Sequence, residues 1–169
     1  LYAQWHTNNY VIFVSNDGTD KTVYVEYPWN TSFTMPSDTF TRTDYTLTGW
    51  NTEKDGTGIP IDIGAKFFNL TAYILYAQWT PIAYTINYVN AVDGTDDVTN
   101  SNPTSYNIET GFTLADPQRI SYVFEGWTYD DVTVPTKTVT IPAGSTKEWT
   151  FTAHWSLANP AILTGNTAF

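Results

Sequence analysis

The sequence predicts a mainly β protein that is built from two tandem copies of one small unit. The pentapeptide Leu-Tyr-Ala-Gln-Trp occurs at residues 1–5 and again at 75–79, and a degenerate copy, Phe-Thr-Ala-His-Trp, occurs at 151–155. Apolar residues alternate with polar ones at period two in several segments, which is typical of half-buried strands. The chain has no cysteine, but its 7 Trp, 12 Tyr and 9 Phe residues can build small cores without disulfides.

The spacing of the pentapeptide defines the organisation of the chain. Its copies are 74 and 76 residues apart, and self-similarity at such a period indicates an array of one structural unit. We therefore assign repeat unit one to residues 6–79 and repeat unit two to residues 80–155. Residues 1–5 are expected to be the final strand of a truncated preceding repeat, and residues 156–169 a linker or the start of another module.

The first strand of each unit is predicted at residues 10–14 and 84–89. The period-two pattern places Tyr10 and Tyr84 on the core side of these strands. A polar turn with an Asp-Gly dipeptide follows each strand, at Asp17 and at Asp93, because glycine accepts the positive φ that tight turns require.

The middle of each unit repeats the same order of signals. Extended stretches at 27–35 and 106–114 are each followed by a proline, which is expected near the end of a strand. Strands at 45–50 and 122–127 then end in a Gly-Trp pair, and we expect Trp50 and Trp127 to lie in the two cores.

The last strand of each unit carries the pentapeptide. Its alternation places Leu75, Ala77 and Trp79 on the core side, and Tyr76 and Gln78 on the outer side. Phe151 and Trp155 are the corresponding core residues of unit two. Only residues 65–70 could form a helical turn or two, so an α+β fold stays open as an alternative.

Taken together, these residues resemble the Listeria–Bacteroides repeat, the B-repeat type found in internalin B and in many bacterial surface proteins. The resemblance covers about residues 8–155. Leu47 stands where phenylalanine is usual, and Phe-Thr-Ala-His at 151–154 replaces Leu-Tyr-Ala-Gln, but both changes keep the inward and outward alternation. The matching positions are Tyr10, Asp17-Gly18, Pro36, Tyr45, Gly49-Trp50 and 75–79 in unit one, and Tyr84, Asp93-Gly94, Pro117, Tyr122, Phe124, Gly126-Trp127 and Trp155 in unit two.

The resemblance implies a β-grasp-like module with little or no helix, in which a mixed sheet curls over a short helix or a loop. It also implies a non-catalytic spacer or stalk, with a possible role in adhesion, in a secreted or wall-attached bacterial protein. The expected localisation is extracellular, at the cell surface or cell wall, with neighbouring repeats of the parent protein as partners. The resemblance carries no catalytic or ligand residue with it.

Charge and hydropathy exclude two classes of partner. The net charge is −10 and only 7 residues are basic, whereas nucleic-acid binding needs clustered Lys and Arg. The sequence has no stretch near the roughly 18 apolar residues of a membrane span. We therefore expect no nucleic-acid partner and no membrane insertion.

The residues suited to catalysis do not form a known constellation, so we expect no enzyme and no catalytic residue. Cysteine is absent, and no serine lies in a Gly-x-Ser-x-Gly elbow. The two histidines, His6 and His154, are expected to be polar surface residues rather than metal ligands. The paired acids Asp96-Asp97 and Asp130-Asp131 are more typical of solvated loops than of a glycosidase.

No cofactor is expected. Two alternatives stay open, a calcium site and a covalent cross-link. The acidic turns could bind calcium through Asp17 and Asp20 in unit one, and through Asp93, Asp96 and Asp97 in unit two. Their spacing differs from that of an EF-hand, and the Asp-Gly turns explain the residues without a metal. A Lys–Asn isopeptide cross-link is the second possibility, with candidate donors Lys21, Lys66, Lys137 and Lys147.

Exposed aromatic residues supply the alternative function, direct binding of a host glycan or surface protein. Tyr24, Tyr76 and Tyr129 are the candidates, because flat rings are platforms on which sugars stack. Cross-strand packing on a β surface is the competing explanation for the same residues.

Overall fold

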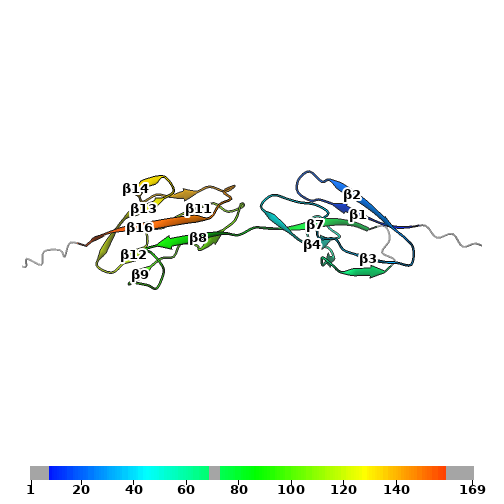
Figure 1. Ribbon diagram of the computed structural model, residues 1–169, viewed down its shortest axis with the longest axis horizontal. Coiled ribbons are helices and arrows are strands. Elements are labelled where there is room, and N and C mark those ends of the chain that lie inside the picture. Colours follow the sequence, from blue (N-terminus) through cyan, green and yellow to red (C-terminus); the bar gives the residue numbers. More distant parts are fainter. Residues whose placement is uncertain (1–7, 69–72, 159–169) are drawn as a thin grey trace, which may run out of the picture. The chain divides into compact units, whose positions relative to one another are not determined.

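The computed structural model describes residues 8–68 and 73–158 (Figure 1). The chain divides into two compact units, with the division between Ile82 and Ala83. The described residues contain strands, turns and loops but no helix, which confirms the mainly β prediction. Residues 66–68, in the segment considered for a helical turn, form a strand instead. The predicted truncated repeat at residues 1–5 lies outside the described residues.

Unit one is built on a five-stranded mixed sheet of order β2-β1-β7-β4-β5, with a separate ribbon of β3 and β6 (Figure 1). The last strand, β7, lies between β1, to which it is parallel, and β4, to which it is antiparallel. The strands are β1 (Asn9–Val14), β2 (Thr22–Tyr27), β3 (Ser32–Thr34), β4 (Tyr45–Asn51), β5 (Pro60–Ile61), β6 (Lys66–Phe68) and β7 (Tyr73–Pro81).

Unit two repeats this arrangement with a sheet of order β10-β8-β16-β13-β14. Again the last strand, β16, is parallel to the first, β8, and antiparallel to β13. Short ribbons pair β11 with β15 and β12 with β9. The strands are β8 (Tyr84–Val89), β9 (Val98–Thr99), β10 (Ser105–Tyr106), β11 (Phe112–Thr113), β12 (Gln118–Arg119), β13 (Tyr122–Tyr129), β14 (Val132–Thr136), β15 (Thr140–Ile141) and β16 (Trp149–Leu157).

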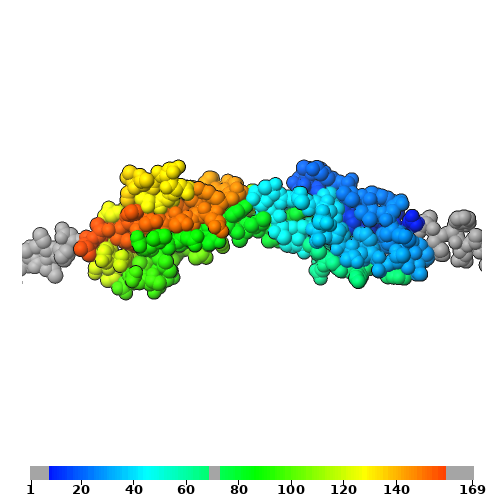
Figure 2. Space-filling model, viewed as in Figure 1, coloured from blue at the N-terminus to red at the C-terminus, as the bar shows by residue number. Residues whose placement is uncertain are grey.

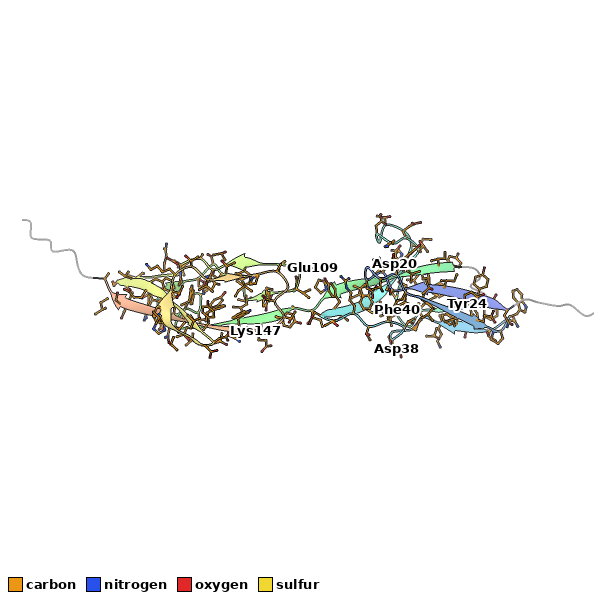
Figure 3. All side chains as sticks on the ribbon, turned by 90° about the horizontal axis from the view of Figure 1, so that it is seen from above. Asp20, Tyr24, Asp38, Phe40, Glu109 and Lys147 are labelled. Atoms are coloured by element: carbon orange, nitrogen blue, oxygen red, sulfur yellow. The ribbon has the colours of Figure 1, made fainter. Side chains whose placement is uncertain are left out.

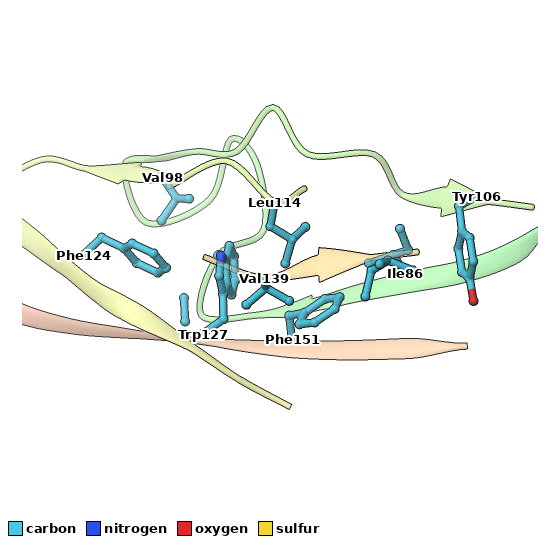
Figure 4. Packing of buried hydrophobic residues seen from close by; sticks show 11 residues of the cluster. Ile86, Val98, Tyr106, Leu114, Phe124, Trp127, Val139 and Phe151 are labelled. Carbon is cyan, nitrogen blue, oxygen red and sulfur yellow. The ribbon is translucent and has the colours of Figure 1, made fainter. Parts of the chain in front are cut away.

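One face of each sheet is covered by loops and a short ribbon, which close a core without a helix. In unit one the covering segments contribute Phe33, Met35 and Phe67 to the core. In unit two they contribute Leu114, Val139 and Ile141, and Figure 4 shows Leu114 and Val139 beside Trp127 and Phe151. This is the β-grasp-like arrangement with loops in place of the helix.

The pentapeptide forms the centre of each sheet, and its alternation decides which side chains are buried. Leu75, Ala77 and Phe151 are completely buried, and Ala153 is 1% exposed. Ala77 lies opposite Trp50 across the sheet, and Ala153 lies opposite Trp127. The small alanine side chain leaves room for the large indole of the neighbouring strand.

The tryptophan of the pentapeptide fastens the last strand to the end of the first. The indole Nε1 of Trp79 donates a hydrogen bond to the carbonyl oxygen of Ser15 at 2.7 Å. Trp155 donates the equivalent bond to the carbonyl oxygen of Asn90 at 2.9 Å. Both indoles also pack at the border of their core, so each tryptophan combines apolar burial with a satisfied polar group.

The Gly-Trp pair marks a β-bulge in both units. The register between β4 and β7 shifts between Leu47 and Gly49, and the register between β13 and β16 shifts between Phe124 and Gly126. A bulge inserts one residue and turns the following side chain. In both units this places the tryptophan in the core, where Trp50 is 1% exposed and Trp127 is fully buried.

Tyr10 was predicted to be a core residue, but it is not one. Relative to the alignment of Tyr10 with Tyr84, the first strand of unit one is shifted by one residue against its last strand. Phe13 lies opposite Leu75, and Tyr88 lies opposite Phe151, so Phe13 and Tyr88 are equivalent. Tyr84 packs at its core as predicted, but its equivalent in unit one is Asn9 rather than Tyr10. A shift of one residue moves a side chain to the opposite face of a sheet, and Tyr10 therefore lies on the outer face.

The two bulge glycines allow a matched test of this geometry. A Cβ atom added at Gly126 would lie 2.5 Å from the backbone nitrogen of Thr136, and the φ of Gly126 is +143°. At Gly49 the closest atom would be the Ile61 oxygen at 3.2 Å, and φ lies outside the unfavourable range.

We therefore predict that Gly126→Ala lowers the free energy of unfolding of unit two by about 2–4 kcal/mol, because it adds both strain and a backbone clash. Gly49→Ala should cost unit one about 1 kcal/mol. Urea denaturation of both variants measures the difference. Equal costs at the two positions would contradict the bulge geometry.

Candidate binding surface

The outer face of the unit-one sheet carries a patch of apolar and aromatic side chains. Ile12 lies opposite Tyr24 of β2 on one side and opposite Ile74 of β7 on the other. Tyr10 and Tyr76 lie on the same face, each two residues from this row along its strand. We call Tyr10, Ile12, Tyr24, Ile74 and Tyr76 the aromatic face.

Tyr24 is the most accessible member of the aromatic face. It is 55% exposed, and Ile74 is 47% exposed. The rings of Tyr10 and Tyr24 stack at a centroid distance of 5.2 Å and an interplanar angle of 21°. Desolvation, followed by the charge of Glu26 and the proximity of Tyr10, raises the pKa of Tyr24. Figure 3 marks Tyr24 beside the strands of unit one.

The corresponding face of unit two is mostly polar, with Val89 as an exposed apolar residue. The register of β8 and β16 places Asn87 opposite Thr150, and Val89 opposite Thr152. These positions correspond to Ile12, Ile74, Val14 and Tyr76 of unit one. The two units therefore have similar cores and the same sheet topology. Within the described residues, only unit one presents aromatic rings on the outer sheet face.

Tyr129, one of the predicted outward-facing rings, lies on the core side of unit two. Its ring meets those of Trp149 and Phe151 edge to face, at centroid distances of 5.9 and 5.2 Å. Tyr129 follows Trp127 by two residues in the same strand, so the period of two places both on one face. The prediction that Tyr129 faces outward was wrong for this reason. Tyr76 does lie on the outer face and is half-buried.

Sequence reasoning missed Tyr10 and Ile12 as members of the outer surface, whereas it placed Ile74 there. Ile74 alternates with Leu75 in β7, so its outward position was readable from the period. The outward positions of Tyr10 and Ile12 could not be read from the period, because β1 is apolar on both faces. That Tyr24 and Ile12 are neighbours depends on strand pairing, which one sequence does not reveal.

The acidic turn of unit one is organised by hydrogen bonds to Asp17. Its Oδ1 accepts bonds from the hydroxyl of Ser15 at 2.8 Å, and from the backbone nitrogen and hydroxyl of Thr19 at 2.9 and 2.6 Å. The side-chain bonds of Thr19 and Ser15 hold the pKa of Asp17 well below its usual range. Asp20 forms an exposed ion pair with Lys54 at 2.5 Å.

The acidic turn of unit two uses its carboxylates differently. Asp93 Oδ1 accepts a hydrogen bond from the backbone nitrogen of Asn100 at 2.8 Å. Asp96 and Asp97 adopt left-handed backbone conformations, with φ of 49° and 58°. No group of three His, Cys, Asp or Glu side chains with metal-binding geometry occurs in residues 8–68 and 73–158. Calcium binding by these turns stays a prediction.

The other sequence candidates have local partners or lie outside the described residues. The Nε2 atom of His154 is 2.8 Å from the hydroxyl oxygen of Thr128, and His6 lies outside the described residues. Lys147 pairs with Asp130 and lies over the ring of Trp149. An isopeptide cross-link stays a prediction.

A shallow hollow in unit two is the next candidate after the aromatic face. Its lining includes Tyr88, Asn100 and Asn102. The Tyr88 hydroxyl donates to the carbonyl of Pro103 at 2.8 Å, and the Asn100 amide donates to the carbonyl of Ala91 at 2.7 Å. Asn102 donates to the carbonyl of Ala115 at 2.8 Å. These polar groups therefore stabilise the loop itself.

The lowered pKa of Asp17 gives a pH-dependent contribution to stability. A carboxylate whose pKa is depressed in the folded state stabilises the fold above its unfolded pKa of about 3.9, and this contribution is lost as the pH falls below that value. We predict that Asp17→Asn lowers the Tm of unit one at pH 7 and that the difference from wild type shrinks between pH 4 and pH 2.

Thermal melts followed by circular dichroism across this range measure the effect. Asp131→Asn, at an exposed position of unit two, is the control and should leave the Tm unchanged at both ends of the range. A difference for Asp17→Asn that is constant with pH would contradict the assignment of the stabilisation to the carboxylate charge.

Comparison with known proteins places unit one in a repeat family. The sequence model of the Listeria–Bacteroides repeat domain matches residues 10–78, which begin in β1 and end in β7. No solved structure matches the chain. In residues 8–68 and 73–158 there is no helix that is long and apolar enough to cross a membrane.

Two proteins of Evansella cellulosilytica are similar to the chain. One, named "Putative Gly-rich membrane protein", is 29% identical over 144 residues, which cover 78% of this chain and 15% of that protein. The other, named "Putative membrane protein", is 36% identical over 87 residues, which cover 47% of this chain and 13% of that protein. The chain thus spans about one seventh of the length of these relatives. From β1 to β7, over residues 10–78, the sequence of unit one matches the Listeria–Bacteroides repeat domain.

Proposed function

We propose that the chain is a non-catalytic tandem repeat segment of a bacterial cell-surface protein, in which each unit acts as a spacer that resists tension. The observation that carries the proposal is the parallel pairing of the first and last strands in both units. Unit two has the same strand order as unit one, and we propose that it is a second repeat of the same family.

Parallel terminal strands determine how a unit responds to a pulling force. The chain enters unit one at the start of β1 and leaves it at the end of β7. Because the two strands are parallel neighbours, these points lie at opposite ends of the pair. Tension along the chain therefore shears the β1–β7 ladder and loads its hydrogen bonds together. An antiparallel pair pulled from adjacent ends would open one bond at a time.

The side chains at this junction add to the resistance. The indole bond from Trp79 to Ser15 crosses from β7 to the end of β1, and the bond from Trp155 to Asn90 does the same in unit two. Phe13 of β1 packs in the same core as Leu75 of β7. Sliding β1 along β7 would break these contacts as well as the ladder.

The relatives support a surface location for the parent protein. Both are named as membrane proteins, and the chain matches about one seventh of their length, as expected for a segment of a larger envelope protein. Repeats joined in series add reach, and they add avidity when the parent protein carries several copies. The acidic charge of the chain, −10, favours solubility at a surface exposed to solvent.

Single-molecule force spectroscopy tests the spacer proposal. Because the chain has no cysteine, handles can be attached at introduced cysteines alone. In the variant Asn8→Cys with Thr80→Cys, force is applied across β1 and β7 in shear. We predict one cooperative rupture that releases about 20–25 nm of chain, from the extended length of about 3.3–3.6 Å per residue.

The matched control moves only one handle. Thr46 lies opposite Thr80 in the antiparallel pair of β4 and β7, so Thr46→Cys with Thr80→Cys pulls that pair apart from adjacent ends. Rupture at the same loading rate should require a lower force than in the first variant. Equal or higher force for the Thr46 handle would contradict the role of the parallel pair.

The aromatic face favours a second candidate function, direct binding of a host glycan or protein by unit one. Tyr24 and Ile74 are exposed on a sheet face that is mostly polar in unit two. Sugar rings stack on such surfaces. On a glycan array, binding by the chain that is lost in Tyr24→Ala and retained in Thr85→Ala would support this function. The absence of any bound glycan, or equal binding by both variants, would count against it.

A further inference from the structure

Within residues 8–68 and 73–158, strand β2 is an edge strand of the unit-one sheet. Among the described residues it has β1 as a neighbour on one side only, and its pairing with β1 runs without interruption over six residues. Tyr24 is 55% exposed and Val23 is 36% exposed. Figure 2 shows the blue residues of unit one, which include β2, at the surface. An edge strand of this kind is a template for pairing with another strand.

The other sheet edges carry features that oppose such pairing. β5 and β10 are only two residues long, and Pro103 precedes β10 closely. β14 is longer but contains Pro135, and its pairing with β13 has a register shift. Short strands, prolines and irregular registers are the usual protections of an edge. β2 contains no proline, no lysine and no bulge.

The hydrogen bonds beside β2 reveal which of its backbone groups point outward. The backbone nitrogen of Ser15 donates to the carbonyl oxygen of Lys21 at 2.8 Å, so these two residues form a hydrogen-bonded pair. Such pairs alternate with non-bonded pairs along an antiparallel ladder. Thr22, Tyr24 and Glu26 are therefore the residues whose N–H and C=O groups point away from β1.

We propose that β2 pairs antiparallel with β2 of a second copy of this chain, about a two-fold axis that passes beside Tyr24. In this register Tyr24 faces Tyr24 of the second copy, and Thr22 faces Glu26. These are the residues with outward backbone groups, so the N–H groups of one strand meet the C=O groups of the other. The two five-stranded sheets become one continuous sheet.

The side chains of β2 are complementary to themselves in the same register. Glu26 lies opposite Thr22 rather than another carboxylate, which avoids a like-charge pair. Val23 lies opposite Val25 on the core side of the sheet, and both are apolar. The two tyrosines lie on the outer side, so the aromatic faces of the two copies join across the axis. A second copy is therefore the occupant that this edge fits.

The size of the contact and the charge of the chain determine the strength of association. One strand pair buries less than the 1,200–2,000 Å² of a standard interface, so the dimer is weak. Each copy carries a net charge of −10, and salt screens the resulting repulsion. Association should therefore strengthen as salt is added. At a cell surface, several copies of the parent protein would add avidity.

Sedimentation equilibrium of the 169-residue chain at 0.15 M and 0.5 M NaCl tests the proposal. We expect a reversible monomer–dimer equilibrium that is stronger at the higher salt concentration. Tyr24→Lys and Tyr24→Glu should each weaken dimerisation by at least about tenfold, because two like charges meet at the axis. A 1:1 mixture of these two variants should associate again, because opposite charges then meet there.

Ser105→Lys is the matched control. Ser105 is an exposed residue of the edge strand β10. The backbone of Ser105 points outward, since Ile86 donates to the carbonyl of the preceding Thr104. This variant should dimerise as wild type does, and thermal melts of all variants check that the fold is retained. A chain that stays monomeric at millimolar concentration, unchanged dimerisation in Tyr24→Lys, or a mixture that fails to associate would overturn the proposal.

Discussion

The structure of each unit depends on one strand that carries the recurring pentapeptide or its degenerate copy. β7 and β16 join the first strand of their unit to the Gly-Trp strand, with parallel pairing on one side and antiparallel pairing on the other. Their inward side chains contribute to the centre of the core, and their tryptophans bond to the end of the first strand. The remaining strands attach to this three-stranded centre. The chain can therefore repeat the pentapeptide and vary the segments around it.

The two units show how this variation is distributed. The core positions are filled by different residues of similar kind, such as Leu75 and Phe151, and both keep the strand buried. The outer face and the sheet edges differ much more. Unit one has a long edge and an aromatic face, whereas unit two has shorter or proline-containing edges and a mostly polar face. The common core is thus the basis of the mechanical role that we propose for both units, while the proposed binding and self-association concern unit one alone.

Some parts of the fold could be predicted because a single physical pattern determined them. The alternation in Leu75 to Trp79 has one clearly apolar face, so its inward and outward sides followed directly. The Gly-Trp pairs recurred at matched places, and both occur at bulges. β1 could not be assigned in the same way. Val11 and Phe13 are apolar, as are Tyr10 and Ile12, so the period gave no preference between the two faces.

Other features depended on contacts between distant segments. β2 was missed as a separate strand. The predicted extended stretch, residues 27–35, began only at Tyr27, which is the residue where β2 ends. The aromatic face brings together residues from β1, β2 and β7, and only the pairing register makes them neighbours. The roles of the turn carboxylates also depend on folded geometry, as the bonds to Asp17 show. Sequence indicated the acidic turns but not which oxygen accepts which bond.

Native-state hydrogen exchange measured by NMR tests the central position of the pentapeptide strand most directly. Amides in the centre of a cooperative unit exchange only through global unfolding, whereas those at its margins exchange through local opening. We predict that the hydrogen-bonded amides of residues 75–79 and 151–155 exchange with the full free energy of unfolding of their unit. Those of the β3–β6 and β11–β15 ribbons should exchange faster. Pentapeptide amides that exchange as fast as those of the ribbons would contradict the central position of this strand.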